Sequence, residues 1–485
     1  MIRLKDPSLL RTKACIAGEW CDADSGATLV VRNPATGEQV ATVPRAGRAE
    51  TLRAIEAADR AFKAWRGTTA EHRARILRRW FELMIEHQDD LALIMTSEQG
   101  KPLAEARGEI AYAAAYVEWF AEEARRAYGD LIPSPWTDRD IVVRKEPVGV
   151  CAAVTPWNFP AAMITRKAAP ALAAGCTMVV KPASQTPLSA LALAELASRA
   201  GVPAGVLSVV TGSAAEIGGA LTASPLVRKL SFTGSTEVGR TLMAQCAPTL
   251  KRLSLELGGN APFIVFDDAD LEAAVEGAIA SKYRNSGQTC VCANRFLVQA
   301  GVYDRFAGML AAAVSRLRVG NGIDADVQQG PLIDPPSLAK VEELVADAVQ
   351  AGATVATGGR RHALGGTFYE PTVLTGVAPG ARVANEEIFG PVAPLIRFET
   401  EEDAIAIANS SEFGLASYFF SRDLARVWRV AGAIEAGMVG VNTGLISTAV
   451  APFGGVKQSG MGREGARYGL EEYMETKYVC LGGLK

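Results

Sequence analysis

Phe232-Thr233-Gly234-Ser235-Thr236-Glu237-Val238-Gly239 carries the chain from an apolar β-rich run through a glycine turn into a helix. In such a turn the backbone N–H groups and the positive end of the helix dipole favour a bound phosphate. The segment departs from the dinucleotide-binding pattern G-x-G-x-x-G because it lacks the middle glycine. In isolation, a tight strand-to-helix turn with a glycine for geometry is the better explanation, so the neighbouring segments have to decide.

Five β-rich runs alternate with short helical stretches around this turn. They cover residues 149–155, 177–181, 206–211, 229–233 and 252–257. This alternation is typical of βαβ units in a parallel sheet. Ligands of such sheets bind at the carboxyl ends of the strands. The polar segments 155–160, 181–187 and 234–239 lie at the carboxyl ends of three of these strands, so the sequence predicts a ligand site along that edge.

The rest of the chain shows three other patterns. Residues 48–127 carry apolar side chains at helical spacing, which predicts a helical layer. Residues 129–148 combine prolines, a tryptophan and alternating β-branched residues, which suits a hairpin projecting between larger units. A second alternation of strands and helices runs from 261 to about 440, with strands expected at 263–266, 296–299, 395–398 and 437–442. It predicts a second α/β domain that carries Cys290.

Composition excludes several classes of partner. At 485 residues the chain is too long for one core, so two or three domains are expected. Its net charge of −3 comes from 53 acids and 50 bases without a long run of one sign, which argues against binding nucleic acid or an anionic membrane. Eight scattered cysteines without paired metal spacings indicate reduced cytoplasmic thiols and no metal site. A small-molecule partner is therefore expected.

Three side chains carry the candidate chemistry. Cys290, in Asn285-Ser286-Gly287-Gln288-Thr289-Cys290-Val291-Cys292, is a strong nucleophile in a turn-forming setting. Only three histidines are available, so Glu256 is the best candidate for its base. Asn158 lies between two prolines that stiffen its loop, and a rigid amide donor suits an oxyanion. Taken alone, a buried apolar Cys290 and a helix-capping Glu256 are equally good explanations.

Seven segments in this order resemble the aldehyde dehydrogenase superfamily over essentially the whole chain. They are residues 155–160, 181–184, 232–239, 255–259, 287–290, Glu386-Glu387-Ile388-Phe389-Gly390-Pro391 and Pro452-Phe453-Gly454-Gly455. Within the superfamily the chain is similar to the succinate-semialdehyde dehydrogenases through 286–295, 442–447 and 460–465. No catalytic position of the family pattern is missing, which argues against a catalytically silent member.

The resemblance implies an α/β fold with three parts. A Rossmann-type dinucleotide-binding domain is expected from residues 1–128 and 148–258, and an α/β catalytic domain from 259–458. A small β element of 129–147 and 459–485 is expected to bridge subunits of a homo-oligomer, either a dimer or a homotetramer. The cytoplasm is the expected location, and 4-aminobutanoate degradation the implied pathway.

The resemblance also implies a mechanism. Cys290 attacks the aldehyde carbonyl while the Asn158 amide and the Cys290 N–H hold the oxyanion. Hydride then passes to a nicotinamide, and Glu256 activates the water that hydrolyses the thioester. The cofactor-binding residues implied are Thr155, Pro156, Trp157, Lys181, Ser184, Gly234, Ser235, Leu257, Glu387 on the ribose, and Phe389.

The choice of cofactor is expected to depend on Lys181 and Ser184. A carboxylate at position 184 would accept hydrogen bonds from the ribose hydroxyls and repel an added 2′-phosphate. The chain has a serine there, and a cation with a hydroxyl donor suits the phosphate of NADP. The alternative is that Ser184 is an ordinary loop residue and that NAD is also used.

The substrate is expected to carry a carboxylate. Arg166 and Arg284 follow or precede the catalytic segments, and with Ser447 they match the positions that bind the succinate-semialdehyde carboxylate in the family. Arginines are otherwise mostly solvated or in structural ion pairs. Glutarate semialdehyde is the nearest alternative substrate, because one methylene gives only about 1 to 3 kcal/mol of discrimination. An enzyme that passes the thioester to coenzyme A is a further alternative, against which Glu256 argues.

Cys292 gives one more expectation. Some succinate-semialdehyde dehydrogenases use the corresponding cysteine pair as a redox switch, so a reversible Cys290–Cys292 disulfide is implied here. Two residues apart in an extended strand, the Cα atoms would lie about 7 Å apart, at the outer limit for a disulfide. The alternative is that Cys292 only packs and that peroxide oxidises Cys290 directly.

Overall fold

Five parallel strands form the centre of the first sheet. The computed structural model describes residues 2–483. The sheet order is β2-β1-β9-β8-β7-β10-β11-β21. Its parallel part confirms the five expected runs as β7 (Val150–Val154), β8 (Thr177–Lys181), β9 (Leu207–Val209), β10 (Val227–Thr233) and β11 (Arg252–Glu256). The outer strands β1 (Ala14–Ile16), β2 (Glu19–Cys21) and β21 (Gly460–Met461) pair antiparallel.

Helices surround this sheet. The expected helical layer is α1 (Arg48–Trp65), α2 (Ala70–Glu86), α3 (Gln88–Gln99) and α4 (Leu103–Glu123). Crossover helices follow the parallel strands as α5 (Ala162–Ala174), α6 (Pro187–Arg199), α7 (Ala214–Ala223) and α8 (Thr236–Cys246). Strands β7 and β8 are almost wholly buried, as expected for parallel strands covered on both faces. The Phe232–Gly239 segment is therefore a genuine strand-to-helix junction at the carboxyl edge.

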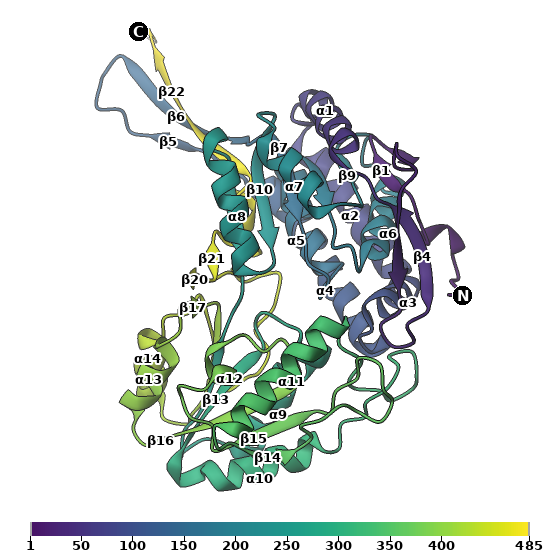
Figure 1. Cartoon of the computed structure of the whole chain (residues 1–485). Coiled ribbons are helices and arrows are strands. Elements are labelled where there is room, and N and C mark those ends of the chain that lie inside the picture. Colours follow the sequence, from purple (N-terminus) through teal and green to yellow (C-terminus); the bar gives the residue numbers. More distant parts are fainter. Residues whose placement is uncertain (1, 484–485) are drawn as a thin grey trace.

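A second sheet lies below the first in Figure 1, mainly in green. Its order is β14-β15-β16-β13-β12-β18-β19. The strands are β12 (Ala261–Val265), β13 (Ala293–Gln299), β14 (Thr354–Thr357), β15 (Thr372–Thr375), β16 (Val392–Phe398), β18 (Ala416–Phe420) and β19 (Met438–Val441). The four expected strands are present. Strand β18, which sequence reasoning missed, pairs with both β12 and β19.

The helices of the second unit include α9 (Leu271–Lys282), α10 (Tyr303–Val314) and α11 (Pro335–Gln350). The shorter helices of this unit are α12 (Arg382–Asn385), α13 (Glu401–Asn409) and α14 (Leu424–Ala433). Aromatic rings of neighbouring strands pack in its core, with the Phe263 ring centroid 5.0 Å from that of Phe296 and 5.1 Å from that of Phe420. Contacts of this kind stabilise the sheet on which the Cys290 loop is mounted.

A three-stranded antiparallel sheet projects from the body together with the C-terminal end of the chain (Figure 1). It consists of β5 (Asp130–Ile132), β6 (Arg139–Pro147) and β22 (Met474–Gly482). Not all of the segment 459–485 belongs to it. Strand β21 pairs with β11, and α15 (Ala466–Glu471) packs against α4 and α5. The first part of 459–485 therefore lies at the edge of the first sheet, and β22 is the part that pairs within the projecting sheet.

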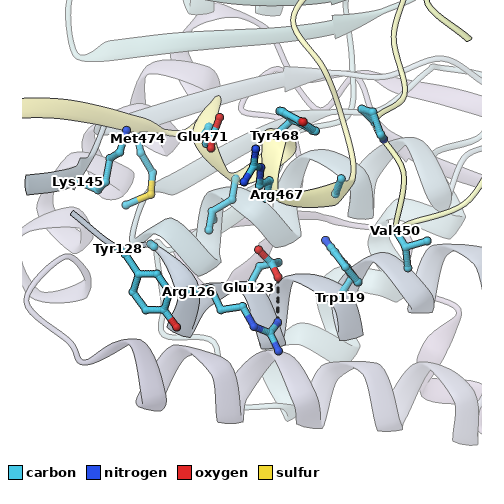
Figure 2. Close-up of a pocket in the computed structure, with 14 residues that line it drawn as sticks. Trp119, Glu123, Arg126, Tyr128, Lys145, Val450, Arg467, Tyr468, Glu471 and Met474 are labelled. Carbon is cyan, nitrogen blue, oxygen red and sulfur yellow. Dashed lines mark hydrogen bonds and ion pairs between the residues drawn. The ribbon is translucent and has the colours of Figure 1, made fainter. Parts of the chain in front are cut away.

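Figure 2 shows a hollow of about 580 Å³ at the base of this projecting sheet. Side chains of α4, α15 and the start of β22 line it, among them Trp119, Tyr468 and Met474. It contains no residue of the expected catalytic or cofactor set. Between residues 2 and 483, no helix is both long enough and apolar enough to cross a bilayer.

Candidate active site

A pocket of about 280 Å³ lies where the carboxyl edge of the first sheet faces the second unit. Nine residues expected from sequence line it: Pro156, Trp157, Asn158, Gly234, Ser235, Leu257, Cys290, Glu387 and Phe389. Ser337 and Lys340 of α11 also line it, and sequence reasoning missed both. Nothing in the helical pattern of 335–350 marks them, because an exposed lysine on an amphipathic helix is ordinary.

The loop that carries Cys290 has an unusual backbone. Asn285, Ser286 and Gly287 have successive φ values of +53°, +57° and +75°, and left-handed conformations cost energy for residues other than glycine. A Cβ on Gly287 would lie 2.2 Å from the Gly390 carbonyl oxygen. The Ser286 hydroxyl donates to the Gly330 carbonyl at 2.8 Å, and the Gln288 side chain accepts from the Ile333 N–H at 2.9 Å. These contacts hold the strained loop in one shape.

Asn158 reaches this loop from the first unit. Its Nδ2 donates to the Gln288 carbonyl at 3.0 Å. Its own carbonyl accepts from Asn285 Nδ2 at 3.0 Å and from Lys101 Nζ at 2.8 Å. The side chain is buried and shares the pocket with Cys290. The structure therefore brings the expected amide donor and the expected nucleophile together.

Glu256 is the last residue of β11 and caps no helix, so the capping explanation is wrong. Its main-chain carbonyl accepts from the Gly234 N–H at 3.1 Å. The carboxylate is buried, and its Oε2 has no hydrogen-bond partner within residues 2–483. Burial, with repulsion from Glu464, raises the pKa of Glu256 well above its ordinary value. A buried carboxylate with an unused oxygen is suited to accept a proton from water.

Cys290 is half-buried at the wall of the pocket. Burial raises the pKa of its thiol to about 12, and the charges of Glu387 and Glu256 act in the same direction. The thiol is therefore neutral near pH 7 and needs a group to take its proton. Exposure to the pocket also distinguishes Cys290 from an inert core cysteine such as Cys151, which is fully buried.

An ion cluster that sequence reasoning missed lies behind Glu256. Arg166 and Lys167 of α5 each contact the Glu464 carboxylate at 2.6 Å. Lys167 Nζ also donates to Thr233 Oγ1 at 2.6 Å. The only sequence signal for this cluster is the Arg166-Lys167 pair inside an apolar helix. Two adjacent charges buried in such a helix need partners of opposite charge.

Of the three expected substrate-binding residues, Arg166 is fully buried, and its guanidinium carbon lies 3.8 Å from the centroid of the Phe453 ring. Its Nε has no hydrogen-bond partner in the described part of the chain. Arg284 lies over the Phe159 ring at 5.3 Å and forms no ion pair with any described residue. Ser447 lines a separate hollow of about 470 Å³ with Tyr112. No hydrogen bond joins the three residues to one another.

The expected cofactor residues fit a nucleotide. Lys181 ends β8, is buried and has no acidic partner within residues 2–483, and burial lowers the pKa of its ammonium to about 8. The Thr155 hydroxyl is buried without a hydrogen-bond partner there. Ser235 caps α8, whose N–H groups face the same edge. Cations and free donors of this kind suit phosphate and hydroxyl groups.

Glu387 and Phe389 supply the other end of that site. Glu387 Oε1 accepts from the Gly259 N–H at 3.1 Å, and burial raises the pKa of its carboxyl to about 7. Phe389 and Trp157 meet edge to face, with ring centroids 5.6 Å apart. Ser184 lies apart from them, half-buried in another hollow of about 650 Å³ beside Gln185. The structure therefore places Ser184 outside the pocket that contains Cys290.

Cys292 is not among the residues that line that pocket. It is buried, its Sγ donates to the Gly287 carbonyl at 3.2 Å, and Lys282 Nζ lies 3.8 Å from the sulfur. Both Cys290 and Cys292 are free thiols. A disulfide between them would require the Cys292 side chain to leave these two partners.

Comparison with known proteins agrees with this geometry. The family model described as the aldehyde dehydrogenase family matches residues 20–479. The chain belongs to the aldehyde dehydrogenase family. It is 67% identical to a glutarate-semialdehyde dehydrogenase of Pseudomonas aeruginosa over the full length of both chains. It is 64% identical to the NADP(+) succinate-semialdehyde dehydrogenase of Escherichia coli, over 99% of this chain and all of that one.

The fold is also shared with solved structures. The crystal structure of a succinate-semialdehyde dehydrogenase from Burkholderia pseudomallei superposes with a TM-score of 0.98, at 66% identity and with 99% of each chain covered. The expected aldehyde dehydrogenase fold and enzyme class are therefore confirmed. Similar relatives carry the names of different substrates, so the family alone leaves the aldehyde open.

Proposed function

We propose that this aldehyde dehydrogenase oxidises succinate semialdehyde to succinate, with NADP preferred over NAD and with glutarate semialdehyde as the alternative substrate. The observation that carries the proposal is a nucleophile pocket with arginine donors left unused nearby. Arg166 Nε is buried without an acceptor within residues 2–483, and Arg284 has no acidic partner there. A substrate with a carboxylate remote from its aldehyde would supply those acceptors.

The residues around Cys290 support the chemistry. The thiol attacks the aldehyde carbon, and its proton passes to Glu256. Asn158 Nδ2 and the Cys290 N–H donate to the oxygen that becomes negative, and one such donor typically lowers the barrier by about 3 kcal/mol. After oxidation a thioester remains on Cys290. Before hydrolysis Glu256 gives the thiol proton up to solvent and is again a carboxylate. It then takes a proton from the water that attacks the thioester and passes it to the departing Cys290 sulfur, which releases the acid and the free thiol.

The nicotinamide dinucleotide fits the pocket by its donors and acceptors. Lys181, Thr155 and the start of α8 would hold its phosphates and adenosine ribose, and Glu387 its second ribose. When bound, it accepts the hydride lost by the substrate carbon. Trp157 and Phe389 would cover a ring at that end and exclude water. The named E. coli relative uses NADP(+).

Hydrolysis is favoured over transfer to coenzyme A because of Glu256. An enzyme that hands its acyl group to a thiol gains nothing from a buried base beside the thioester, since water would destroy the intermediate. The unpartnered Oε2 of Glu256 supports a water-activating role. Turnover with purified protein, succinate semialdehyde and NADP, without coenzyme A, tests this choice directly.

Arg284→Met tests the choice of substrate. We expect the KM for succinate semialdehyde to rise about tenfold or more, because a hydrogen bond to a charged group contributes about 1.5 to 3 kcal/mol. Butyraldehyde, which lacks the carboxylate, serves as the matched control and should show little change. Arg284 is the better of the two arginines for this test, because replacing Arg166 would also remove an ion-pair partner of Glu464. Equal losses on both aldehydes would assign Arg284 a structural role.

Ser184→Glu tests the choice of cofactor. The added carboxylate should repel a 2′-phosphate, so the affinity for NADP should fall by about tenfold or more relative to the affinity for NAD. A loss of this size corresponds to the free energy of one or two charged interactions. Fluorescence titration of both cofactors against both proteins measures the ratio. Because Ser184 lies outside the Cys290 pocket, kcat at saturating NAD should be unaffected. An unchanged NADP/NAD ratio removes Ser184 from the site.

A reversible Cys290–Cys292 disulfide is proposed as an oxidative switch. After mild peroxide, the peptide holding both cysteines should lose two hydrogens by mass spectrometry, and dithiothreitol should restore activity. Cys292→Ala should then lose reversibility. Because Cys292 would have to leave Gly287 and Lys282, the bond should be strained and easily reduced. Detecting only oxygenated Cys290, with equal inactivation of the variant, contradicts the switch.

The protein is proposed to work as a cytoplasmic homo-oligomer, a dimer or tetramer, in 4-aminobutanoate degradation. The projecting sheet supports association, because Leu131, Tyr478 and Leu481 are exposed on it, and apolar side chains gathered on a protruding element are typical of an interface. Light scattering on the purified protein gives the number of subunits. A monomeric mass would exclude this assembly.

A further inference from the structure

The short connection between α3 and α4 lies directly beneath the Asn158 loop. Its residue Lys101 is buried, with 1% of its side chain exposed. The second unit packs closely on this connection: the Leu103 N–H donates to the Gly322 carbonyl at 2.8 Å, and a Cβ on Gly330 would lie 2.1 Å from the Gly100 carbonyl oxygen. The connection is therefore held from both sides and is a fixed support.

Lys101 uses its ammonium on the catalytic loop. Nζ donates to the Asn158 carbonyl at 2.8 Å and to Glu109 Oε2 at 2.5 Å, and it lies 4.0 Å from the centroid of the Phe159 ring. Burial lowers the pKa of Lys101, while the Glu109 carboxylate opposes that shift. A charged donor to a backbone carbonyl fixes the peptide more firmly than a neutral one.

Glu109 extends the support to α5. Its Oε1 accepts from the N–H groups of Ala161 and Ala162 at 2.9 and 3.2 Å, where α5 begins. Helix α5 carries Arg166 and Lys167. The buried Lys101–Glu109 ion pair therefore fixes Asn158, which lies before α5 and is the proposed oxyanion donor. It also fixes α5, the helix that holds the ion cluster.

The same connection reaches the nucleophile loop. Gln99 Oε1 accepts from the Lys101 N–H at 2.9 Å, and its Nε2 donates to Asn285 Oδ1 at 2.9 Å. Asn285 Nδ2 in turn donates to the carbonyls of Asn158 and Gln288. The segments that supply the two oxyanion donors are thus tied to one support.

We infer that Lys101, paired with Glu109, is a positioning residue that aims the Asn158 amide at the substrate oxygen. A buried ion pair by itself adds little to stability, because desolvation offsets its attraction. Here the Lys101 ammonium also donates to the backbone carbonyl of Asn158, the oxyanion donor. A residue that served stability alone would not need this contact. The inference rests on the proposed function, in which Asn158 is that donor.

A positioning role has a kinetic signature. The Asn158 donor acts mainly in the transition state, so a misaimed amide lowers kcat and leaves cofactor affinity and KM nearly unchanged. Losing a charged hydrogen bond should reduce kcat by about tenfold to a hundredfold. The effect should disappear when Asn158 has no amide to aim, which makes a double-mutant cycle the decisive experiment.

The cycle compares the full-length protein with Lys101→Met, Asn158→Ala and the double variant. We expect Lys101→Met to lower kcat in the wild-type background and to change it less than about twofold in the Asn158→Ala background. Lys229→Met is the matched control, because Lys229 is equally buried and contacts Glu472 at 3.4 Å. It lies towards the amino end of β10 and does not line the Cys290 pocket. Its effect on kcat should be the same in both backgrounds, even if it lowers the Tm.

Each outcome is decisive. An equal loss in both backgrounds, or an unchanged kcat in folded Lys101→Met, overturns the positioning role. A normal kcat in Asn158→Ala alone overturns the oxyanion role in the proposed function instead. Thermal melting is measured first for every variant. If Lys101→Met does not fold, Glu109→Gln takes its place. The amide oxygen keeps the acceptor for the Ala161 N–H, while an NH2 donor replaces the charged oxygen that accepts from Lys101 Nζ. The same coupling to Asn158 is expected.

Discussion

Replacing Cys290 by alanine should abolish aldehyde oxidation, with turnover falling by a factor on the order of 10⁵ or more, as for loss of a covalent nucleophile in other enzymes. The physical reason is that Cys290 supplies the thiol of its pocket. Cys292, the nearest cysteine in sequence, is buried and donates a hydrogen bond to the Gly287 carbonyl. NADPH formation at saturating succinate semialdehyde measures the loss.

The matched control for this variant is Cys480→Ala, because Cys480 is an exposed thiol on the projecting sheet. It should keep full activity. NADP binding by Cys290→Ala should also be normal, which shows that the pocket is intact. Retention of more than a trace of turnover by the alanine variant would mean that another group attacks the aldehyde.

Glu256→Gln should give the second-largest effect. We expect steady-state turnover to fall by a factor of about 10² to 10⁴, the usual contribution of a general base. If acylation survives, rapid mixing should show a burst of NADPH equal to the enzyme concentration, followed by slow hydrolysis of the thioester. Glutamine keeps the size of the side chain and removes only its ability to take a proton.

Glu98→Gln is the matched control. Glu98 is also a fully buried carboxyl, with its pKa raised to about 8 by burial, but its oxygens accept from the Leu188 and Ser189 N–H groups at the start of α6. Its replacement should leave the burst and the hydrolysis rate unchanged. Normal steady-state turnover in Glu256→Gln would show that Glu256 is not the base.

These two groups also determine the pH dependence. Glu256 must be ionised to act as a base, and burial raises its pKa, so activity should fall on acidification at a pH above the usual range for glutamate. The Cys290 thiol, with a pKa near 12, loses its proton more easily as the pH rises. Activity should therefore increase from pH 6 to pH 9. In Glu256→Gln the acidic limb due to the carboxylate should be absent.

Sequence reasoning identified the first sheet and much of the pocket because both depend on local patterns. Runs such as 177–181 are short, apolar and bounded by turns, and the residues that follow them share one edge by topology. The same reasoning placed Asn158 and Gly234 at one edge, whereas only the family resemblance added Cys290 to that site. All three residues line one pocket.

The strand and the residues that sequence reasoning missed depend on contacts that no local pattern encodes. Strand β18 is buried on both faces, so Ala416–Phe420 shows no alternation to mark it. Lys101 and Glu464 belong to segments whose charges look solvated, and their burial follows only from partners such as Asn158 and Lys167. The place of Ser184, outside the Cys290 pocket, also depends on how the two units meet.

The pairing of Lys167 with Glu464 spans 297 positions of the chain, and this separation has a consequence during biosynthesis. At about 5 to 20 residues per second, the ribosome needs roughly 15 to 60 s to supply the anion after the cation. Until then Lys167 and Arg166 lack the carboxylate that contacts both of them in the folded protein, and burying them would be costly. A nascent chain therefore cannot close the interior around α5 before its final residues emerge. Prematurely terminated polypeptides lack Glu464 altogether, so they should remain open at this point and be the first targets of cellular proteases.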